Sequence, residues 1–357
     1  TSVQGGTDIS IEFKHLYLVE DNVFYSIQGG TILIPQQYKT RDSDKNAVID
    51  ASLFKSDEYK NYIRTDESGN LFVDSKHYSL KQKVVQPQAA MVITDYKTGH
   101  VKAMAGGRNT VGVQLFNRAV NPRQPGSSIK PIAVYGAALQ QSLEIMEGGS
   151  TPNFITYDNA GNPVDNSYGT YFTAASVIDD APLIVNGKQW PKNWYSGFRG
   201  LHTLRTSVQQ SVNVNAVKVI QQVGVEYAAD FSEKLGISSI IRSGDTNDMN
   251  AAALALGGMS KGISPLEMAS AYGTYPNGGV YVEPIIYTHV TNSHGETILE
   301  KTPRSEEVVD PGVAFIMTDI LRSVVTEGLG SGASISNQPV GGKTGTTTDN
   351  YDAWFVG

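Results

Sequence analysis

Three short polar motifs occur along this chain in an order that could support acyl transfer. Residues 127–130 read Ser-Ser-Ile-Lys, residues 211–213 read Ser-Val-Asn, and residues 343–346 read Lys-Thr-Gly-Thr. A serine hydroxyl attacks a carbonyl when a nearby base takes its proton, and a desolvated, neutral lysine can be that base. A second lysine beside two threonine hydroxyls could bind a carboxylate. The motifs therefore predict a nucleophile, its bases and an anion clamp.

The same short patterns occur a second time in the same order, at residues 52–55, 68–70 and 97–99. Residues 66–70, Asp-Glu-Ser-Gly-Asn, have the composition of an ordinary turn. Lys97 falls between two apolar runs, at a hairpin turn where its side chain would face water. We therefore expect this second set to lie in surface loops and to be chemically silent.

The first motif lies where an irregular stretch, Gln-Pro-Gly at residues 124–126, gives way to a helix. A serine at a helix start has unpaired backbone N–H groups beside it, and the helix dipole favours a developing alkoxide. Lys130 falls on the same helical face as Ser127, within reach of its hydroxyl. Taken alone, this pattern more often marks a helix N-cap followed by a solvated lysine.

Each of the other two motifs also has a functional and a purely structural interpretation. Ser211 and Asn213 follow helix-like residues 203–210, where they could relay a proton and hold a substrate amide, or simply form a polar helix end. The threonines of residues 343–348 favour a strand, and the glycine among them would let a ligand approach the backbone. An N–H at this strand edge could complete an oxyanion hole with the N–H of the first motif's serine. The alternative is an ordinary edge strand with a surface lysine.

Residues 1–86 form a polar, β-favouring region. Its short apolar runs are separated by Glu-Asp-Asn and by Gly-Gly, which predicts a meander; the runs are residues 16–19, 23–27 and 31–34. Residues 40–70 are charged and loop-like.

From residue 87 the pattern changes. Two apolar runs around a glycine-bearing turn, residues 89–94 and 101–105, predict a hairpin. Residues 125–278 are mostly helical and include a capping box at residues 264–267. A further helix opens at Asp310-Pro311 and ends at Gly328.

Strands return near residues 342–347 and 352–356. Strands, then helices, then strands from distant sequence predict an α+β domain with helices packed on an antiparallel sheet. We therefore expect a β-rich region over residues 1–86 and a larger domain over residues 87–357.

Composition excludes several functions. The chain has 357 residues and a net charge of −7 with no basic block, which makes nucleic acid an unlikely partner. The absence of cysteine excludes thiol catalysis and cysteine-based zinc sites, and the six histidines form no i,i+4 pair, so we expect neither a metal nor another cofactor. No apolar run of about 18 residues occurs, so no membrane span is predicted within the chain.

From about Gln88 to Gly357 the chain resembles the transpeptidase domain of class A penicillin-binding proteins, within the β-lactamase-like serine acyltransferases. The three motifs together are the signature of this group. Other segments resemble it as well: residues 116–119, 123–127, 180–183, 190–193, 198–200, 263–272, 277–279, 326–328 and 352–357. The resemblance implies an antiparallel, five-stranded-type sheet with packed helices and an all-helical subdomain, preceded by a small β-rich linker domain.

The resemblance also implies a role for each motif residue. Ser127 attacks the D-Ala-D-Ala carbonyl of a peptidoglycan stem peptide, and Lys130 is its base. Ser211 carries the proton toward the leaving nitrogen. Asn213 orients Lys130 and the substrate amide, and Lys343 supports Ser211 electrostatically.

The third motif is implied to bind the substrate. Thr344 and Thr346 would hold the terminal carboxylate, with Gly345 and Thr348 also in the substrate-binding set. The N–H groups of Ser127 and Thr346 would form the oxyanion hole. The acyl group then passes to an amine of a neighbouring stem. β-Lactams would acylate the same serine because they mimic D-Ala-D-Ala.

The implied partners are stem peptides, their lipid-linked precursor and β-lactam antibiotics. A glycosyltransferase domain is expected in the full-length protein but not in this chain. The family usually continues with another strand and a C-terminal helix, so we expect a truncated C-terminal end. We also expect an enzyme at the extracytoplasmic face of the bacterial cell membrane, anchored by an N-terminal segment outside this chain.

Three enzymes or sensors with the same motifs remain alternatives: a β-lactamase, a D,D-carboxypeptidase and a penicillin sensor. No Glu-x-x-Leu-Asn string, which would place a hydrolytic base as in class A β-lactamases, occurs between Ser211 and Lys343. Class D enzymes prefer an apolar residue at the position of Asn213. A carboxypeptidase differs only in its acceptor, and a sensor would acylate without processing a peptide.

Overall fold

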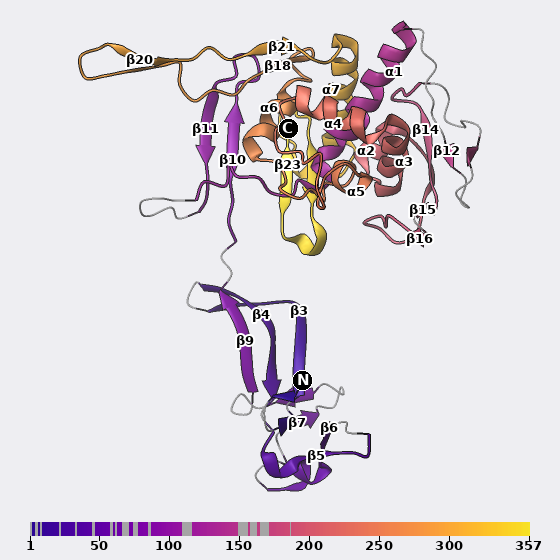
Figure 1. The fold of residues 1–357 in the computed structure, drawn as a ribbon, viewed down its shortest axis with the longest axis vertical. Helices are drawn as coiled ribbons and strands as arrows, with labels where there is room; N and C mark the ends of the chain where they lie inside the picture. The colour runs from indigo at the N-terminus through magenta and orange to yellow at the C-terminus, as the bar shows by residue number, and fades with distance from the viewer. Residues whose placement is uncertain are drawn as a thin grey trace. The chain divides into compact units, whose positions relative to one another are not determined.

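The computed structural model divides into two compact units, residues 1–88 and 89–357 (Figure 1). The boundary expected from the sequence, between residues 86 and 87, falls beside this division. The structure describes the following residues: 2–3, 6–7, 9–20, 23–32, 34–44, 47–57, 60, 63–65, 71–73, 78–84, 87–108, 116–148, 156–157, 163–164, 171–185 and 187–357.

The first unit consists mainly of antiparallel strands. Its largest sheet has the order β3-β4-β9 and contains β3 (Ile9–Glu20), β4 (Val23–Ile32) and β9 (Tyr78–Val84). Smaller pairs are β1 (Ser2–Val3) with β2 (Gly6–Thr7), β5 (Lys39–Arg41) with β6 (Ala47–Ile49), and β7 (Ile63–Thr65) with β8 (Leu71–Val73).

The expected break at Gly29 and Gly30 is wrong. Both glycines lie inside β4 and pair with β9, directly after a register shift between Ile27 and Gly29. Glycine inside a strand often accompanies such an irregularity, because it accepts the local backbone bend. The predicted run at residues 23–27 and the first two residues of the run at 31–34 therefore belong to one strand.

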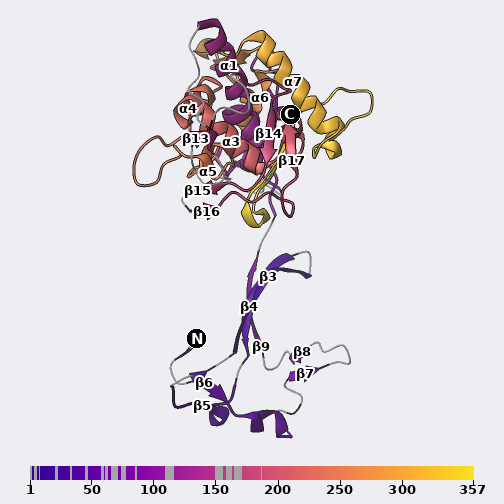
Figure 2. The same cartoon turned by 90° about the vertical axis from the view of Figure 1, so that its right-hand side faces the viewer.

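In the second unit, the α-helices among the described residues surround a buried π-helix, Lys130–Gly136, in which every residue is buried. Helices α3, α4 and α5 lie side by side (Figure 2). The helices are α1 (Ala137–Gly148), α2 (Leu204–Gln209), α3 (Asn213–Val223), α4 (Val225–Lys234), α5 (Ala251–Leu254), α6 (Pro265–Gly273) and α7 (Pro311–Thr326).

Local sequence explains where two of these helices begin. At α6 the Ser264 side chain accepts from the Glu267 N–H, and the Glu267 carboxylate accepts from the Ser264 N–H, so the predicted capping box is confirmed. At α7 the Asp310 side chain accepts from the first free N–H groups of the helix. The apolar face of α7 packs into the core through side chains that include Met317 and Ile320.

The strands of the second unit pair in antiparallel twos. The predicted hairpin is present as β10 (Met91–Thr94) and β11 (Val101–Ala105), and the third motif forms β22 (Lys343–Thr346) with β23 (Ala353–Val356). Helix α6 packs against both hairpins (Figure 1). The α+β fold class is confirmed. Among the described residues, no strand pairs with both the β10–β11 hairpin and the β22–β23 hairpin. Each hairpin is therefore a separate two-stranded sheet.

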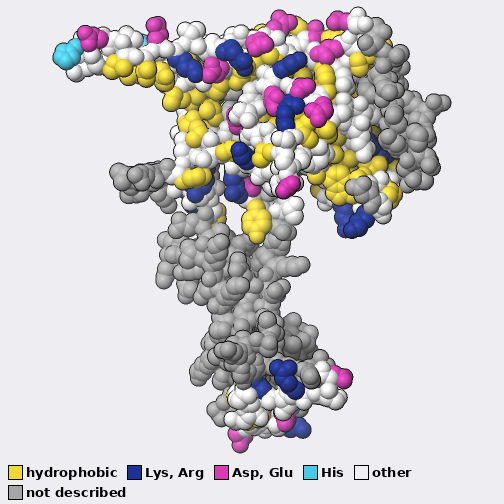
Figure 3. Space-filling model, in the orientation of Figure 1, with side chains coloured by type: hydrophobic (Ala, Val, Ile, Leu, Met, Phe, Trp, Pro, Cys, Tyr) yellow, Lys and Arg dark blue, Asp and Glu magenta, His cyan; other side chains and the backbone are white. Residues whose placement is uncertain are grey.

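The remaining strand pairs are β12 (Thr156–Tyr157) with β13 (Pro163–Val164), β14 (Val177–Asp180) with β17 (Gly200–Thr203), β15 (Ile184–Val185) with β16 (Lys188–Gln189), β18 (Val280–Val282) with β21 (Ser305–Glu307), and β19 (His289–Thr291) with β20 (Thr297–Glu300). Hydrophobic side chains gather along the β19–β20 arm (Figure 3). They include Val290, Ile298 and Leu299.

Candidate active site

Ser127 lies in a tight turn that leads into the buried π-helix. Residues Gly126–Ile129 form a 3-10 helix, and Gly126 has a φ of 53°, a left-handed value that glycine adopts without strain. The predicted helix start is therefore confirmed, although its first turns are 3-10 and π rather than α. Ser127 is half-buried, and among the described residues nothing hydrogen-bonds to its hydroxyl.

Two tyrosines, Tyr272 of α6 and Tyr275 just after it, form hydrogen bonds to this irregular helix. The sequence analysis did not single them out. The hydroxyl of Tyr272 donates to the Ser128 carbonyl at 2.5 Å, and that of Tyr275 donates to the Pro131 carbonyl at 2.7 Å. The two phenols therefore add side-chain donors to carbonyls of the 3-10 turn and of the π-helix that follows it. Tyr272 ends one of the segments that carry the family resemblance, which is the signal that could have drawn attention to it.

The Lys130 amine is buried and bonds to the second motif. Its Nζ donates to the Ser211 carbonyl at 2.8 Å and to Asn213 Oδ1 at 2.7 Å, and it lies 3.4 Å from Ser211 Oγ. The sequence predicted that Lys130 would reach the Ser127 hydroxyl; in the structure its described partners are Ser211 and Asn213. Burial, and next the charge of Lys343, hold the pKa of Lys130 well below its ordinary value.

The second motif is a turn between two helices. Ser211 has a φ of 54°, which is uncommon for a residue with a side chain, and its N–H donates to the Val208 carbonyl at 3.1 Å. Asn213 is the first residue of α3. This sharp reversal points both the Ser211 carbonyl and the Asn213 amide at Lys130. The predicted polar helix end is thus also a binding site for the buried amine.

Lys343, the first residue of β22, is fully buried as well. Its Nζ donates to the Thr344 carbonyl at 3.0 Å. Burial lowers the pKa of Lys343 to about 7. Neither Lys343 nor Lys130 has a carboxylate acting on it within the described chain, so the site holds two desolvated amines without a counterion.

Glycines let β22 lie directly against the Ser127 turn. A Cβ on Gly345 would collide with the Pro125 carbonyl oxygen and would lie 2.9 Å from the Ser128 nitrogen. A Cβ on Gly126 would lie 2.6 Å from the carbonyl oxygen and 3.0 Å from the nitrogen of Thr346. The backbone beside Ser127 and the backbone of Thr346 are therefore in contact.

The threonines of the third motif differ in exposure. Thr344 is half-buried, whereas Thr346 and Thr348 are exposed. Beyond the end of β22 the surface has a hollow of about 400 Å³ that Thr348 helps to line. Its lining residues are Pro122, Arg123, Gln124, Ser260, Lys261, Thr347, Thr348, Tyr351 and Asp352.

The second set of motifs gathers no such environment. Ser52 and Lys55 are exposed in a short 3-10 helix, where Asp50 caps the Ser52 N–H at 2.8 Å. Lys97 is exposed at the β10–β11 turn, as predicted. Residues 68–70 lie outside the described chain.

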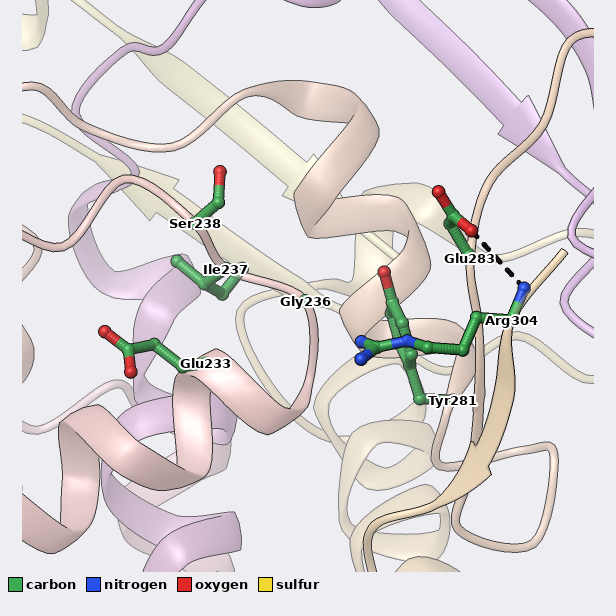
Figure 4. Close-up of a pocket in the computed structure, with 7 residues that line it drawn as sticks. All are labelled: Glu233, Gly236, Ile237, Ser238, Tyr281, Glu283 and Arg304. Carbon is green, nitrogen blue, oxygen red and sulfur yellow. Dashed lines mark hydrogen bonds between the residues drawn. The ribbon is translucent and has the colours of Figure 1, made fainter.

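A second hollow, of about 500 Å³, contains none of the motif residues (Figure 4). The Arg304 guanidinium lies over the Tyr281 ring at 5.8 Å, and the Arg304 N–H donates to Glu283 at 3.3 Å. Glu233, on the opposite wall, is paired with Arg242 at 2.9 Å. The Glu283 carboxylate is paired with Lys301 at 2.7 Å, so both carboxylates of this hollow already have a cationic partner.

No group of three or more potential metal-ligating side chains comes together within the described residues. In the same part of the chain, none of the helices combines the length and the apolar character that crossing a bilayer requires.

Comparison with known proteins places this geometry in a family. The model of the penicillin-binding protein transpeptidase domain matches residues 170–357. Penicillin-binding protein 1A of Clostridium botulinum is 31% identical over 328 residues, which are 90% of this chain and 37% of that protein. Penicillin-binding protein 1A of Aquifex aeolicus is 32% identical over 293 residues, 81% of this chain and 35% of that protein. The chain thus spans little more than a third of these relatives.

A solved structure shows the same fold. Penicillin-binding protein 1A from Haemophilus influenzae superposes with a TM-score of 0.59 at 20% identity, covering 96% of this chain and 52% of that one. The matched family model includes the second and third motifs, and the 31% identical relative aligns over nine-tenths of the chain. This chain belongs to the transpeptidase domain family of penicillin-binding proteins.

Proposed function

We propose that the second unit is a D,D-transpeptidase that cross-links peptidoglycan stem peptides through an acyl-enzyme on Ser127. One observation carries the proposal: the buried Lys130 amine bonds to Ser211 and Asn213 and has no counterion among the described residues, where the hydroxyl of Ser127, one helical turn earlier, is also free. A lysine kept neutral by burial can accept a proton from a serine hydroxyl. Burial lowers the pKa of Lys130 and so favours the neutral amine, which is the form that accepts a proton.

The acylation step follows from these positions. Ser127 Oγ bonds to the carbonyl carbon of the penultimate D-Ala while its proton passes to Lys130 Nζ. The oxyanion accepts hydrogen bonds from the backbone N–H groups of Ser127 and Thr346, a stabilisation worth about 3 kcal/mol per donor in other enzymes. The C–N bond then breaks, and the proton returns through Ser211 Oγ to the departing D-Ala amine.

Deacylation repeats these steps with another nucleophile. An amine of a neighbouring stem attacks the ester carbon, loses its proton to the same relay, and releases Ser127 Oγ. The product is an amide cross-link, so one peptide bond has been exchanged for another without oxidation or added energy. Asn213 has a second N–H on Nδ2 with which to hold the donor stem's amide.

The third motif suits the terminal carboxylate of the donor. Thr344 and Thr346 present hydroxyls along β22, Gly345 lets the strand lie against the Ser127 turn, and Lys343 contributes positive potential when it is protonated. Thr348 extends this row toward the hollow at the end of the strand.

β-Lactams are proposed as inhibitors that acylate the same serine. PonA1 from Mycobacterium tuberculosis, whose fold is similar (TM-score 0.58, 22% identity), has a solved structure in complex with penicillin V. We further propose that the enzyme works at the extracytoplasmic face of the cell membrane, on stem peptides and their lipid-linked precursor. Its glycosyltransferase partner domain would belong to the full-length protein.

Intact-mass spectrometry with penicillin V tests the acyl-enzyme. The wild-type chain should gain the mass of one penicillin, Ser127→Ala should gain none, and the matched Ser52→Ala variant should be labelled like the wild type. An adduct that persists in Ser127→Ala, or is lost in Ser52→Ala, would show that another serine is the nucleophile.

The acceptor is tested separately with a D-Ala-D-Ala stem peptide. We expect a cross-linked dimer when a stem with a free amine is supplied. Hydrolysis with no dimer would identify a D,D-carboxypeptidase instead, and penicillin turnover at many cycles per second would identify a β-lactamase.

A further inference from the structure

We infer that Asp180 and Asn193 are positioning residues for the acylation step: they hold Asn213, and through it Lys130, in the reactive arrangement. The inference rests on the proposed function, because it assigns how that site is kept in shape. It begins at the start of α3. The residue before this helix, Val212, has no side chain that could cap it.

A distant side chain caps α3 instead. Asn193 Oδ1 accepts from the Asn213 N–H at 2.9 Å and from the Val214 N–H at 3.3 Å. These are N-terminal N–H groups that no residue within the helix can satisfy. The first turn of α3, and with it the backbone of Asn213, is therefore fixed by the loop that contains Asn193.

The same loop determines which way the Asn213 amide faces. Asn213 Nδ2 donates to the Lys192 carbonyl at 2.8 Å, so the amide oxygen is left on the side of Lys130, whose Nζ lies 2.7 Å away. If the amide were reversed, two N–H donors would face the amine and a carbonyl would face an oxygen. Residues 192 and 193 thus orient both the backbone and the side chain of Asn213.

Asp180 fixes the loop in turn. Its Oδ1 accepts from Asn193 Nδ2 at 2.7 Å, which forces Asn193 Oδ1 toward α3. Its Oδ2 accepts from the Tyr195 hydroxyl at 2.7 Å and from the Arg199 N–H at 2.8 Å. The carboxylate is only 1% exposed, and it stands on β14 in register with Gly200 of β17.

Asp180 acts through position rather than through its charge. The charge that acts on Lys130 comes from Lys343, whereas the Asp180 carboxylate reaches Lys130 only through Asn193 and Asn213. Displacing a catalytic group by about 1 Å can cost roughly 100-fold in rate. We therefore expect loss of this brace to slow acylation while leaving Ser127 and Lys130 chemically intact.

The direction of each hydrogen bond suggests a test by exchange. An amide has only one oxygen. In Asp180→Asn this oxygen can accept from Tyr195 and Arg199, but the amide N–H then faces the N–H donor of Asn193. In Asn193→Asp two carboxylates face each other. The double exchange Asp180→Asn with Asn193→Asp restores every bond. The amide oxygen introduced at position 180 would accept from Tyr195 and Arg199, and the amide nitrogen there would donate to position 193. The carboxylate at position 193 would then cap α3, where the helix dipole favours it.

We would measure the acylation rate constant and the dissociation constant for a fluorescent penicillin separately, with thermal melting of each variant. We expect about 100-fold slower acylation in each single variant, a dissociation constant changed by less than threefold, and recovery to within about fivefold of wild type in the double exchange. Tyr195→Phe, which removes a donor to the other carboxylate oxygen only, is the matched control and should acylate at a rate near that of wild type.

Several outcomes would overturn the inference. One is single variants that acylate like the wild type. Another is a folded double exchange that stays as slow as the single variants. A third is Tyr195→Phe as slow as Asp180→Asn, which would indicate a general effect of the loop. If the double exchange does not fold, a double-mutant cycle of Asn193→Ala and Asn213→Ala decides. We expect the double alanine variant to acylate no more slowly than Asn213→Ala alone, and additive losses of rate would refute the coupling. Labelling that persists in Ser127→Ala would refute the proposed function. The comparisons among the Asp180, Asn193 and Tyr195 variants do not depend on that result.

Discussion

Lys130 Nζ and Asn213 Oδ1 lie 2.7 Å apart, although 83 residues separate them in the sequence. This bond joins the π-helix that contains Lys130 to the start of α3, and the Ser211 carbonyl completes the environment of the amine at 2.8 Å. Both acceptors are uncharged. The site thus satisfies the hydrogen bonds of a lysine without supplying a negative charge that would keep it protonated.

Substitutions of Lys130 should therefore distinguish the effect of its positive charge from its role as a base. Lys130→Arg keeps a cation but cannot accept a proton at any ordinary pH, since guanidinium stays protonated. We expect both Lys130→Arg and Lys130→Met to reduce the acylation rate constant by roughly 10²- to 10⁴-fold, the usual contribution of a general base. Stopped-flow measurements with a fluorescent penicillin provide the check. Lys97→Met, in the exposed turn, is the matched control, and an active Lys130→Arg would exclude a lysine base.

Burial of Lys343 should make stability depend on pH. The folded protein binds this proton only below about pH 7, whereas the unfolded chain binds it up to the ordinary pKa of 10.5. Between these values the unfolded chain carries more protons, so the free energy of unfolding should rise with pH from about 7 to about 10.5, by a few kcal/mol. Below pH 7 the cost of the buried charge is present in full.

Urea unfolding of Lys343→Met across this pH range measures that contribution. The variant should lose much of the rise, and the part that Lys130 causes should remain. Lys234→Met, at an exposed position of α4, should keep the wild-type dependence. A Lys343→Met curve that rises as steeply as that of the wild type would contradict a depressed pKa at this lysine.

Close backbone packing makes Gly345 intolerant of a side chain. Gly345→Ala would press its Cβ into the Pro125 carbonyl and the Ser128 backbone, and such overpacking usually costs about 1–3 kcal/mol. We expect a lower melting temperature together with slower acylation, because β22 must move away from Ser127. Gly332→Ala, where a Cβ would meet nothing within 4 Å, serves as the control. Equal melting temperatures for the two variants would refute this packing argument.

The tyrosine that braces the π-helix should contribute measurable stability. Tyr275→Phe removes this hydrogen bond to the buried Pro131 carbonyl, at a cost of about 0.5–1.5 kcal/mol. Chemical denaturation followed by tryptophan fluorescence gives the difference. Tyr287→Phe, at a more exposed position, should change stability by less than about 0.5 kcal/mol. If both variants unfold alike, the phenol at residue 275 adds nothing to the helix.

Local patterns in the sequence predicted local structure well. The capping box of α6, the β10–β11 hairpin and the strand of the third motif form where spacing and residue type indicated. Those elements are stabilised mainly by their own neighbours. The break expected at Gly29 and Gly30 did not form, because pairing with β9, distant in sequence, overrides the turn preference of glycine.

The long-range relationships of the site could not be predicted in the same way. That Lys130 bonds to Ser211 and Asn213 depends on a reversal at Ser211, which has a φ that sequence patterns rarely assign to serine. Likewise, nothing in the residues near α3 indicates that Asn193 caps it from another segment. Motif order predicts which residues form the candidate site, whereas tertiary packing decides which of their atoms meet.

The glycine contacts around Ser127 have a consequence for how this gene can change. Gly126 is enclosed by Thr346 on one side and by Gly257 on the other, and a Cβ on Gly257, at a φ of 76°, would enter the Gly126 backbone. A single codon change at either glycine, or at Gly345, inserts atoms where another main chain already lies. Under antibiotic selection, viable variants should therefore arise at the rim of the site, for example at the exposed Lys261, and not in this backbone cluster.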